Sequence, residues 1–265
     1  MRAASLLFHD VYIGEVDESG FSSDAANRYK LSLRDFDAQL AALAGVCPDA
    51  PLLATDLIGS RREFPFLITF DDGGVSYYTV VADRLETLGW RGHSFVSTDC
   101  IGQRGFVDAS QIRELDARGH VIGSHSASHP TRFSACSPER MREEWSRSRQ
   151  TLEDLLGHAV TVASLPGGYY SRTVARGARD AGLRVLFTSE PTTGIQNEAG
   201  CTVVGRYTIR RGDGQDFARR LVASRWTRCS AWARWNAKGL VKPILGPSYM
   251  RIADWLLSRP PVASR

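Results

Sequence analysis

Short apolar runs recur along much of the chain and predict buried β-strands. Each run is four or five residues long and is bounded by polar or glycine-containing segments, as in strands covered on both faces. The predicted strands are Ser5–Phe8, Phe66–Phe70, His93–Ser97, Val121–Ser124, Val160–Ser164 and Val185–Thr188.

Amphipathic segments lie between most of these strands and predict helices. Tyr77–Leu88 carries apolar residues at helical spacing and ends at Gly89. A Ser-Pro-Glu start predicts a helix over Ser137–Leu156, because serine caps a helix and proline suits its first position. Ala109–Arg118 and Arg172–Ala181 are each followed by a glycine. Strands alternating with helices indicate an α/β fold with a mainly parallel sheet or barrel.

Two polar segments and a distinctive C-terminal region interrupt this pattern. We predict surface loops at Asp10–Asn27 and Pro191–Gly200, a main domain of residues 1–223, and a basic, tryptophan-rich helical appendage of residues 224–265. The appendage either packs its tryptophans on the domain or forms an amphipathic helix pair resting on a membrane surface. Its residues of interest are Trp226, Trp232, Trp235, Trp255, Arg225, Arg228, Arg234, Lys238, Lys242 and Arg251.

Composition narrows the class of protein. The chain has 265 residues, of which 43% are hydrophobic and 23% charged, and this suits a globular domain with a sizeable core. A net charge of +4 does not call for a nucleic acid, and none is expected as a partner. The five cysteines form no CxxC pair and predict free thiols in a reducing compartment. The first apolar run is too short for a secretion signal, so we expect a cytoplasmic protein, and peripheral membrane contact stays open for the C-terminal segment.

An Asp-Asp-Gly turn follows one of the predicted strands. Asp71 and Asp72 come directly after Phe66–Phe70 and precede Gly73. Functional groups of α/β folds gather at the carboxyl ends of strands. One carboxylate could bind a metal while the other takes a proton from water. Taken alone, however, such a turn is more often a loop with two solvated aspartates.

Two histidines follow the next strand but one. His125 and His129 are four positions apart, which on a helical turn places them on one face, close enough to share a cation. A lone histidine is more often structural, but two of six at this spacing are harder to dismiss. With Asp72 they make a set of two imidazoles and one carboxylate, which leaves room for water on a catalytic ion. The Pro166-Gly167-Gly168-Tyr169 turn offers backbone amides for an oxyanion, but by itself it is a weak signal.

Taken in order, these motifs resemble the polysaccharide deacetylase family, or NodB-homology domain, also called carbohydrate esterase family 4. The resemblance runs from about Phe64 to Thr188 and rests on Thr-Phe-Asp-Asp-Gly and His-Ser-Ala-Ser-His. It implies a distorted (β/α) barrel with the active site at the strand ends. It also implies that Asp71 is the catalytic base, that Asp72, His125 and His129 bind the metal, and that Pro166 and Gly167 help to hold the oxyanion. Tyr169 is expected to contact substrate.

The chain departs from the family at two motifs. Ser164 stands where the family has an arginine that orients the catalytic aspartate, so that role is either absent or supplied from elsewhere. No histidine follows His158, yet Leu6-Leu7-Phe8-His9 fits the family's last motif at the opposite end of the chain. This resembles the circularly permuted branch that includes the deacetylases of poly-N-acetylglucosamine export. It implies that His9 is the general acid.

The expected function is metal-dependent hydrolysis of N-acetyl groups on an amino-sugar polysaccharide, oligosaccharide or precursor, at a C–N bond other than a peptide bond. The expected metal is Zn²⁺, with Co²⁺, Ni²⁺ or Fe²⁺ as alternatives for a mixed nitrogen and oxygen set. Two other functions stay open. The same site could cleave an O-acetyl ester or another amide, or the chain could be a non-catalytic carbohydrate-binding protein, as the missing arginine suggests.

Overall fold

A curved, nine-stranded sheet forms the centre of the protein. The computed structural model describes residues 1–57, 59–198 and 200–245. The strand order is β11-β1-β4-β5-β6-β7-β8-β10-β9, and every neighbouring pair is parallel except β10 and β9. The strands are β1 Ala4–Phe8, β4 Phe66–Phe70, β5 His93–Val96, β6 Val121–Ser124, β7 Val162–Ser164, β8 Val185–Phe187, β9 Ile195–Glu198, β10 Cys201–Val204 and β11 Tyr207–Thr208.

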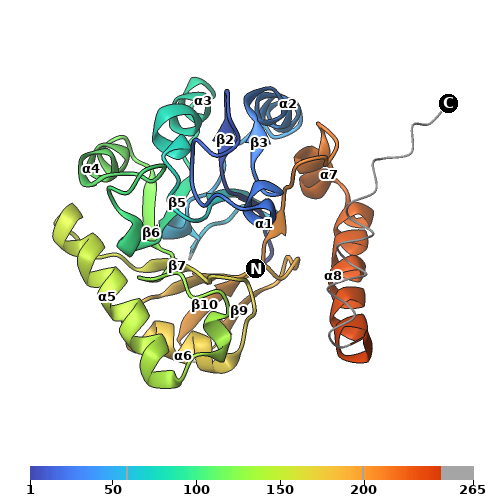
Figure 1. Cartoon of the computed structure of the whole chain (residues 1–265). Helices are drawn as coiled ribbons and strands as arrows, with labels where there is room; N and C mark the ends of the chain where they lie inside the picture. The colour runs from blue at the N-terminus through green and yellow to red at the C-terminus, as the bar shows by residue number, and fades with distance from the viewer. Residues whose placement is uncertain (58, 199, 246–265) are drawn as a thin grey trace.

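Helices surround the sheet on its outer side (Figure 1). They are α1 Asp24–Asn27, α2 Leu33–Ala44, α3 Ala82–Thr87, α4 Ala109–Ala117, α5 Pro138–Leu156, α6 Arg172–Asp180, α7 Phe217–Ala223 and α8 Arg225–Leu245. A π-helical turn, Tyr77–Val81, leads into α3, so the helix predicted over Tyr77–Leu88 is present in two parts. The alternation confirms the predicted distorted α/β barrel.

Side-chain alternation along β4 explains how the sheet separates its two faces. Phe66, Ile68 and Phe70 belong to the outer core, which also contains residues of α2 and α3. Leu67 lies on the opposite face, in a cluster with Phe95 and Phe187. Because successive side chains of a strand point to opposite faces, Thr69 shares the inner face with Leu67. The strand therefore delivers the residues that follow it to the carboxyl end of the barrel.

Helix caps follow the signals in the sequence. Ser137 caps α5 by accepting a hydrogen bond from Arg140 N, with Pro138 as the first helical residue, and the helix ends at Gly157 in a left-handed conformation. Asp108 caps α4 in a reciprocal capping box with Gln111.

Both predicted loops contain regular structure. Pro191–Gly200 was predicted as a loop, but it includes β9, which pairs antiparallel with β10. Three of the four β9 residues are polar, because this strand lies at the edge of the sheet and does not need an apolar face. Within Asp10–Asn27, Val11–Tyr12 forms β2, which pairs with β3, Leu31–Ser32, and α1 closes the segment.

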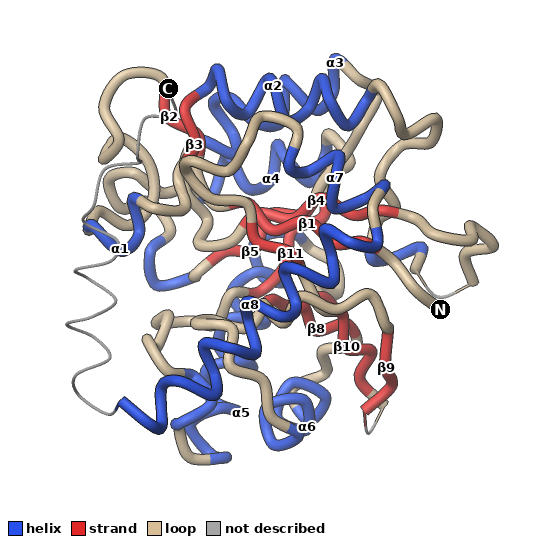
Figure 2. The backbone as a smooth tube through the Cα atoms, turned by 90° about the vertical axis from the view of Figure 1, so that its right-hand side faces the viewer, coloured by secondary structure: helices blue, strands red, loops and turns tan. Residues whose placement is uncertain are grey.

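The C-terminal region follows α7 and begins with α8, which lies beside β11 at one edge of the sheet (Figure 2). The predicted division at residue 224 stays a prediction, as does the second helix of the appendage. Arg251 and Trp255 lie outside the described residues, and the side chains of Lys238 and Lys242 are likewise outside them. None of the helices described is both long and apolar enough to cross a membrane.

Candidate metal centre and catalytic carboxylate

Asp72, His125 and His129 meet at the carboxyl end of the barrel. Asp72 Oδ1 lies 3.4 Å from Nε2 of His125 and 3.4 Å from Nε2 of His129. One donor atom from each residue lies within 4.8 Å of the other two. Asp72 has a φ of 79°, a left-handed conformation that is rare outside glycine and turns its carboxylate toward the histidines. The structure thus brings together the three predicted ligands.

The surroundings of these residues prepare them to bind a cation. The Nδ1–H of His125 donates to the Ser164 carbonyl oxygen at 2.9 Å, which leaves the Nε2 lone pair for a metal. Burial by itself raises the pKa of Asp72, but its contacts with the His125 and His129 imidazoles hold that pKa well below its ordinary value. Two imidazoles and one carboxylate are a donor set that suits a catalytic divalent metal ion, and the residues therefore fit one.

The two histidines lie on an irregular loop, and the helical turn expected from their spacing is wrong. After β6 ends at Ser124, the segment turns through Ser126 at a φ of 62° and His129 at a φ of 50°. Such left-handed conformations cost about 1–3 kcal/mol each and persist only where the surroundings enforce them. The loop brings the imidazoles together by backbone strain.

Glu144 of α5 anchors this loop through hydrogen bonds. Its carboxylate is buried and accepts hydrogen bonds from Ala127 N at 3.0 Å, Ser128 N at 2.8 Å and Ser128 Oγ at 2.7 Å. Arg140 is paired with it at 2.6 Å. Glu144 therefore fixes the two residues that separate Ser126 from His129.

Replacing Glu144 with glutamine is expected to weaken metal binding about 10–100-fold, because an amide cannot accept all of these hydrogen bonds and the loop relaxes. Metal affinity measured by competition with a chelator tests this. Glu143→Gln is the matched control, since Glu143 is exposed and, among the described residues, forms an ion pair with Arg140 alone, at 3.5 Å. Equal affinity in the wild type and Glu144→Gln would show that the loop holds its shape without the carboxylate.

Asp71 is held by an arginine from a distant part of the chain. Arg206 lies between β10 and β11, is fully buried, and binds both carboxylate oxygens of Asp71, at 2.7 Å and 2.8 Å. It also donates to Thr188 O at 2.9 Å and to Ser164 Oγ at 2.7 Å. Burial by itself raises the pKa of Asp71, but the Arg206 guanidinium outweighs it and holds the pKa below its ordinary value. Asp71 is therefore ionised at neutral pH.

Arg206 contacts Asp71 in place of the arginine that the family has at the position of Ser164. The pairing of Arg206 with Asp71 was missed in the sequence analysis. One signal was available: Arg206 follows the buried strand Cys201–Val204, and a charge at such a position needs a partner. The small side chain of Ser164 lies against the guanidinium, and the arginine comes from the segment between β10 and β11.

His9 lies close to both aspartates although it comes from the start of the chain. Its ring packs on Tyr29 with centroids 4.7 Å apart. Burial lowers the pKa of His9, while the charges of Asp72 and Asp71 act in the opposite direction. His9 Nδ1 is buried, and no described residue hydrogen-bonds to it. The structure brings His9 to the site, and its role as general acid stays a prediction.

The turn after β7 adjoins the metal ligands through Ser164. Gly167 has a φ of 69°, and a Cβ there would lie 2.7 Å from Thr131 O, so the turn requires glycine. Pro166 is buried and Gly167 is exposed. Tyr169 is 41% exposed, with the Arg132 guanidinium 5.7 Å from its ring centroid. Their predicted roles toward the oxyanion and substrate stay predictions.

Asp10, next to His9, anchors the segment predicted to be a surface loop. Its buried Oδ1 accepts hydrogen bonds from Ser19 Oγ at 2.5 Å and Ser76 Oγ at 2.8 Å. Gly20 and Gly74 allow this approach, because a Cβ on either would lie within 2.0 Å of the carboxylate. Burial raises the pKa of Asp10 to about 6.

Asp10 is expected to make the folded state less stable as the pH rises. Its folded pKa lies above its unfolded value, so its contribution is full below about pH 4 and is lost as the pH rises through 6. Relative to Asp10→Asn, the free energy of unfolding of the wild type should fall by about 2–3 kcal/mol over that range. Denaturant titrations at several pH values test this. A constant difference between the two proteins would contradict it.

The fold and the site define a class, that of distorted α/β barrels with a candidate metal centre of one aspartate and two histidines. A family model described as polysaccharide deacetylase matches residues 59–186, a range that includes both aspartates and both metal-binding histidines. The chain belongs to the polysaccharide deacetylase family.

Individual relatives agree with this family. YxkH of Bacillus subtilis (strain 168) is 25% identical over 145 residues, which cover 55% of this chain and 50% of YxkH. IcaB from Ammonifex degensii is 25% identical with a TM-score of 0.66, covering 84% of this chain and 97% of IcaB. Streptococcus pyogenes deacetylase PplD, in complex with acetate, is 17% identical with a TM-score of 0.69, covering 84% and 98%, and shows the same fold. The chain spans half or less of the length of the curated relatives that it matches.

Proposed function

We propose that the protein is a metal-dependent hydrolase that removes N-acetyl groups from an amino-sugar chain or its precursor. The observation that carries the proposal is the position of Asp71. Its Oδ2 lies 4.0 Å from Nε2 of His125, and Arg206 keeps the carboxylate ionised beside the metal ligands. A base beside a Lewis-acid site is what hydrolysis of an amide by water requires.

Each residue of the site has a part in this reaction. A divalent ion held by Asp72, His125 and His129, with Zn²⁺ as our first choice over Co²⁺, Ni²⁺ or Fe²⁺, would polarise the acetyl carbonyl and acidify water. Asp71 accepts a proton from the attacking water. The Gly167 N–H donates to the developing oxyanion. Protonated His9 donates to the leaving amine, which departs poorly without a proton.

Two other functions can be distinguished from the proposed one. The chemistry of the leaving group distinguishes an esterase, and Arg206 bears on a non-catalytic protein. An O-acetyl ester needs less help from a general acid, so His9→Ala would spare ester cleavage and impair amide cleavage. A non-catalytic carbohydrate-binding protein was motivated by the missing arginine at Ser164. The Arg206 guanidinium beside Asp71 favours the enzyme over that alternative.

The test is metal analysis of the purified protein combined with acetate release from N-acetylglucosamine oligosaccharides and from an O-acetylated xylan. One bound metal per chain and metal-dependent acetate release from the first substrate are expected. Chelation should abolish release, and restoring the metal should recover it. A metal-free protein that binds the oligosaccharide without releasing acetate would reject the proposal, and release from the xylan alone would favour the esterase.

The C-terminal segment was also predicted to contact a membrane surface. Trp226 is 75% exposed and Trp232 is 53% exposed on α8, which is the observation in its favour. Trp235 lies differently, since it lines a cavity against the barrel. Membrane contact and a cytoplasmic location therefore stay predictions.

A further inference from the structure

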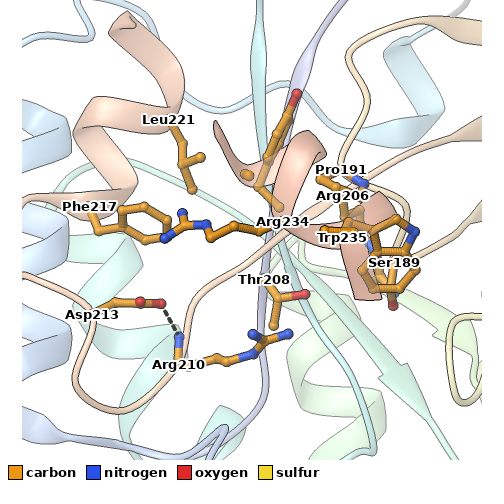
Figure 3. Close-up of a pocket in the computed structure, with 13 residues that line it drawn as sticks. Ser189, Pro191, Arg206, Thr208, Arg210, Asp213, Phe217, Leu221, Arg234 and Trp235 are labelled. Carbon is orange, nitrogen blue, oxygen red and sulfur yellow. Dashed lines mark hydrogen bonds between the residues drawn. The ribbon is translucent and has the colours of Figure 1, made fainter. Parts of the chain in front are cut away.

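A cavity of about 290 Å³ lies between α8 and the end of β11, outside the site already described (Figure 3). It is lined by Thr208 and Arg210 from the barrel and by Arg234 and Trp235 from α8. Its volume is near the lower end for small-molecule sites, enough for about one sugar ring. Both α8 residues lie beyond the range matched by the family model, so this cavity belongs to the C-terminal part of the chain.

Two residues that line the cavity contact residues of the proposed active site or their neighbours. Arg206 lines it and also holds the Asp71 carboxylate. On the barrel side, the Arg210 guanidinium lies 5.4 Å from the ring centroid of Tyr29, and Tyr29 packs on His9. Because β11 pairs in parallel with β1, Arg210 follows its strand at the same end of the sheet at which His9 follows β1. A sugar in the cavity would neighbour one at the active site.

The charges in the cavity favour an anion. Arg210 Nε is buried, and no described residue accepts a hydrogen bond from it. Arg234 is exposed, and we find no hydrogen bond or ion pair between its side chain and any described residue. Arg206 is already paired with Asp71, so two arginines are available for a ligand.

Asp213 is the acidic residue that lines the cavity, and its carboxylate already accepts a hydrogen bond. Its carboxylate accepts a hydrogen bond from the Arg210 backbone N–H at 2.8 Å (Figure 3). Burial raises the pKa of Asp213, while the charges of Arg210 and Arg234 act in the opposite direction. Two arginines against one such carboxylate leave the cavity positive. Figure 3 shows Trp235 at one side of it, where its flat ring can pack on the apolar face of a sugar.

We propose that this cavity is a subsite for a carboxylate or phosphate group carried by the sugar chain next to the acetylated residue. The inference rests on the proposed function and narrows its substrate to anionic amino-sugar chains. Arg210 and Arg234 bind the anion, since guanidinium groups match the oxygens of carboxylate and phosphate. Trp235 supports the ring that bears it.

Binding of three ligands to the full chain with its metal, in the Asp71→Asn background that suppresses turnover, tests the subsite. The ligands are a neutral N-acetylglucosamine tetramer, a hyaluronan tetrasaccharide that carries carboxylates, and N-acetylglucosamine 1-phosphate. At least one anionic ligand should bind 10-fold or more tightly than the neutral tetramer. The carboxylate and phosphate arms identify which anion is preferred.

Variants separate the subsite from general attraction to a basic protein. Arg210→Met and Arg234→Met should each reduce the preference for the anionic ligand about 10-fold and leave binding of the neutral tetramer within twofold. Trp235→Ala should weaken binding of both tetrasaccharides. Arg225→Met is the control, since Arg225 is exposed on the same helix and does not line this cavity.

Equal binding of all three ligands, or an unchanged preference in Arg234→Met, would overturn the subsite. Acetate release by the wild type without any anionic preference would reject the subsite and leave the proposed function intact. Selective binding of the anionic ligand without acetate release by the wild type would support the subsite and reject the hydrolase.

Discussion

Asp71→Asn is expected to lower the rate of acetate release about 10²–10⁴-fold, the range that a positioned general base contributes. The asparagine amide has nearly the same shape as the carboxylate, but it cannot accept the proton from water. Bound metal should stay at the wild-type level, because Asp72, His125 and His129 are unchanged. Steady-state kinetics and metal analysis on the same preparation measure both quantities.

The neighbouring aspartate provides the matched control. Asp72→Asn is expected to lose the metal itself, since Asp72 is the one carboxylate of the ligand set among the described residues. Two adjacent, chemically identical residues should therefore fail in different ways. Acetate release close to the wild-type rate in Asp71→Asn would remove the base from the mechanism, and full metal content in Asp72→Asn would remove that ligand.

Arg206→Met is expected to cause the largest loss of stability, about 3–5 kcal/mol, because it leaves the Asp71 carboxylate buried without a partner. The direction of the pH dependence follows from the pKa of Asp71, which in the folded wild type lies below its unfolded value. This pairing stabilises the fold above about pH 4 and its contribution is lost as the pH falls through the folded pKa. The difference between wild type and variant should therefore shrink in acid.

Two measurements distinguish pairing from packing in Arg206. The double variant Arg206→Met/Asp71→Asn removes the buried charge as well as the arginine, so it should recover part of the lost stability. In the single variant, burial acts on Asp71 without the opposing guanidinium, so the pKa of Asp71 rises and the acid limb of acetate release should move to higher pH. If the double variant were less stable than the single one and the pH profile did not move, Arg206 would serve packing alone.

Most of the fold follows from local patterns. The apolar runs located six strands to within one or two residues, because a parallel strand covered on both faces must be apolar along its length. Ser137 and Gly157 bound α5 through backbone hydrogen bonds that need no distant partner. The edge strand β9 was not predicted, since three of its four residues are polar and its pairing with β10 defines it.

The sequence by itself determined the candidate residues of the site: the paired aspartates, the two histidines and His9 are recognisable by type, order and spacing. Only the tertiary structure decided how they are held. The histidine loop depends on Glu144, the carboxylate of Asp71 depends on Arg206, and Trp235 faces the barrel. Arg206 and Asp71 are 135 positions apart. Local sequence patterns cannot predict such pairs, because a buried charge pairs with a group that lies near it in space. The curvature of the sheet sets that distance.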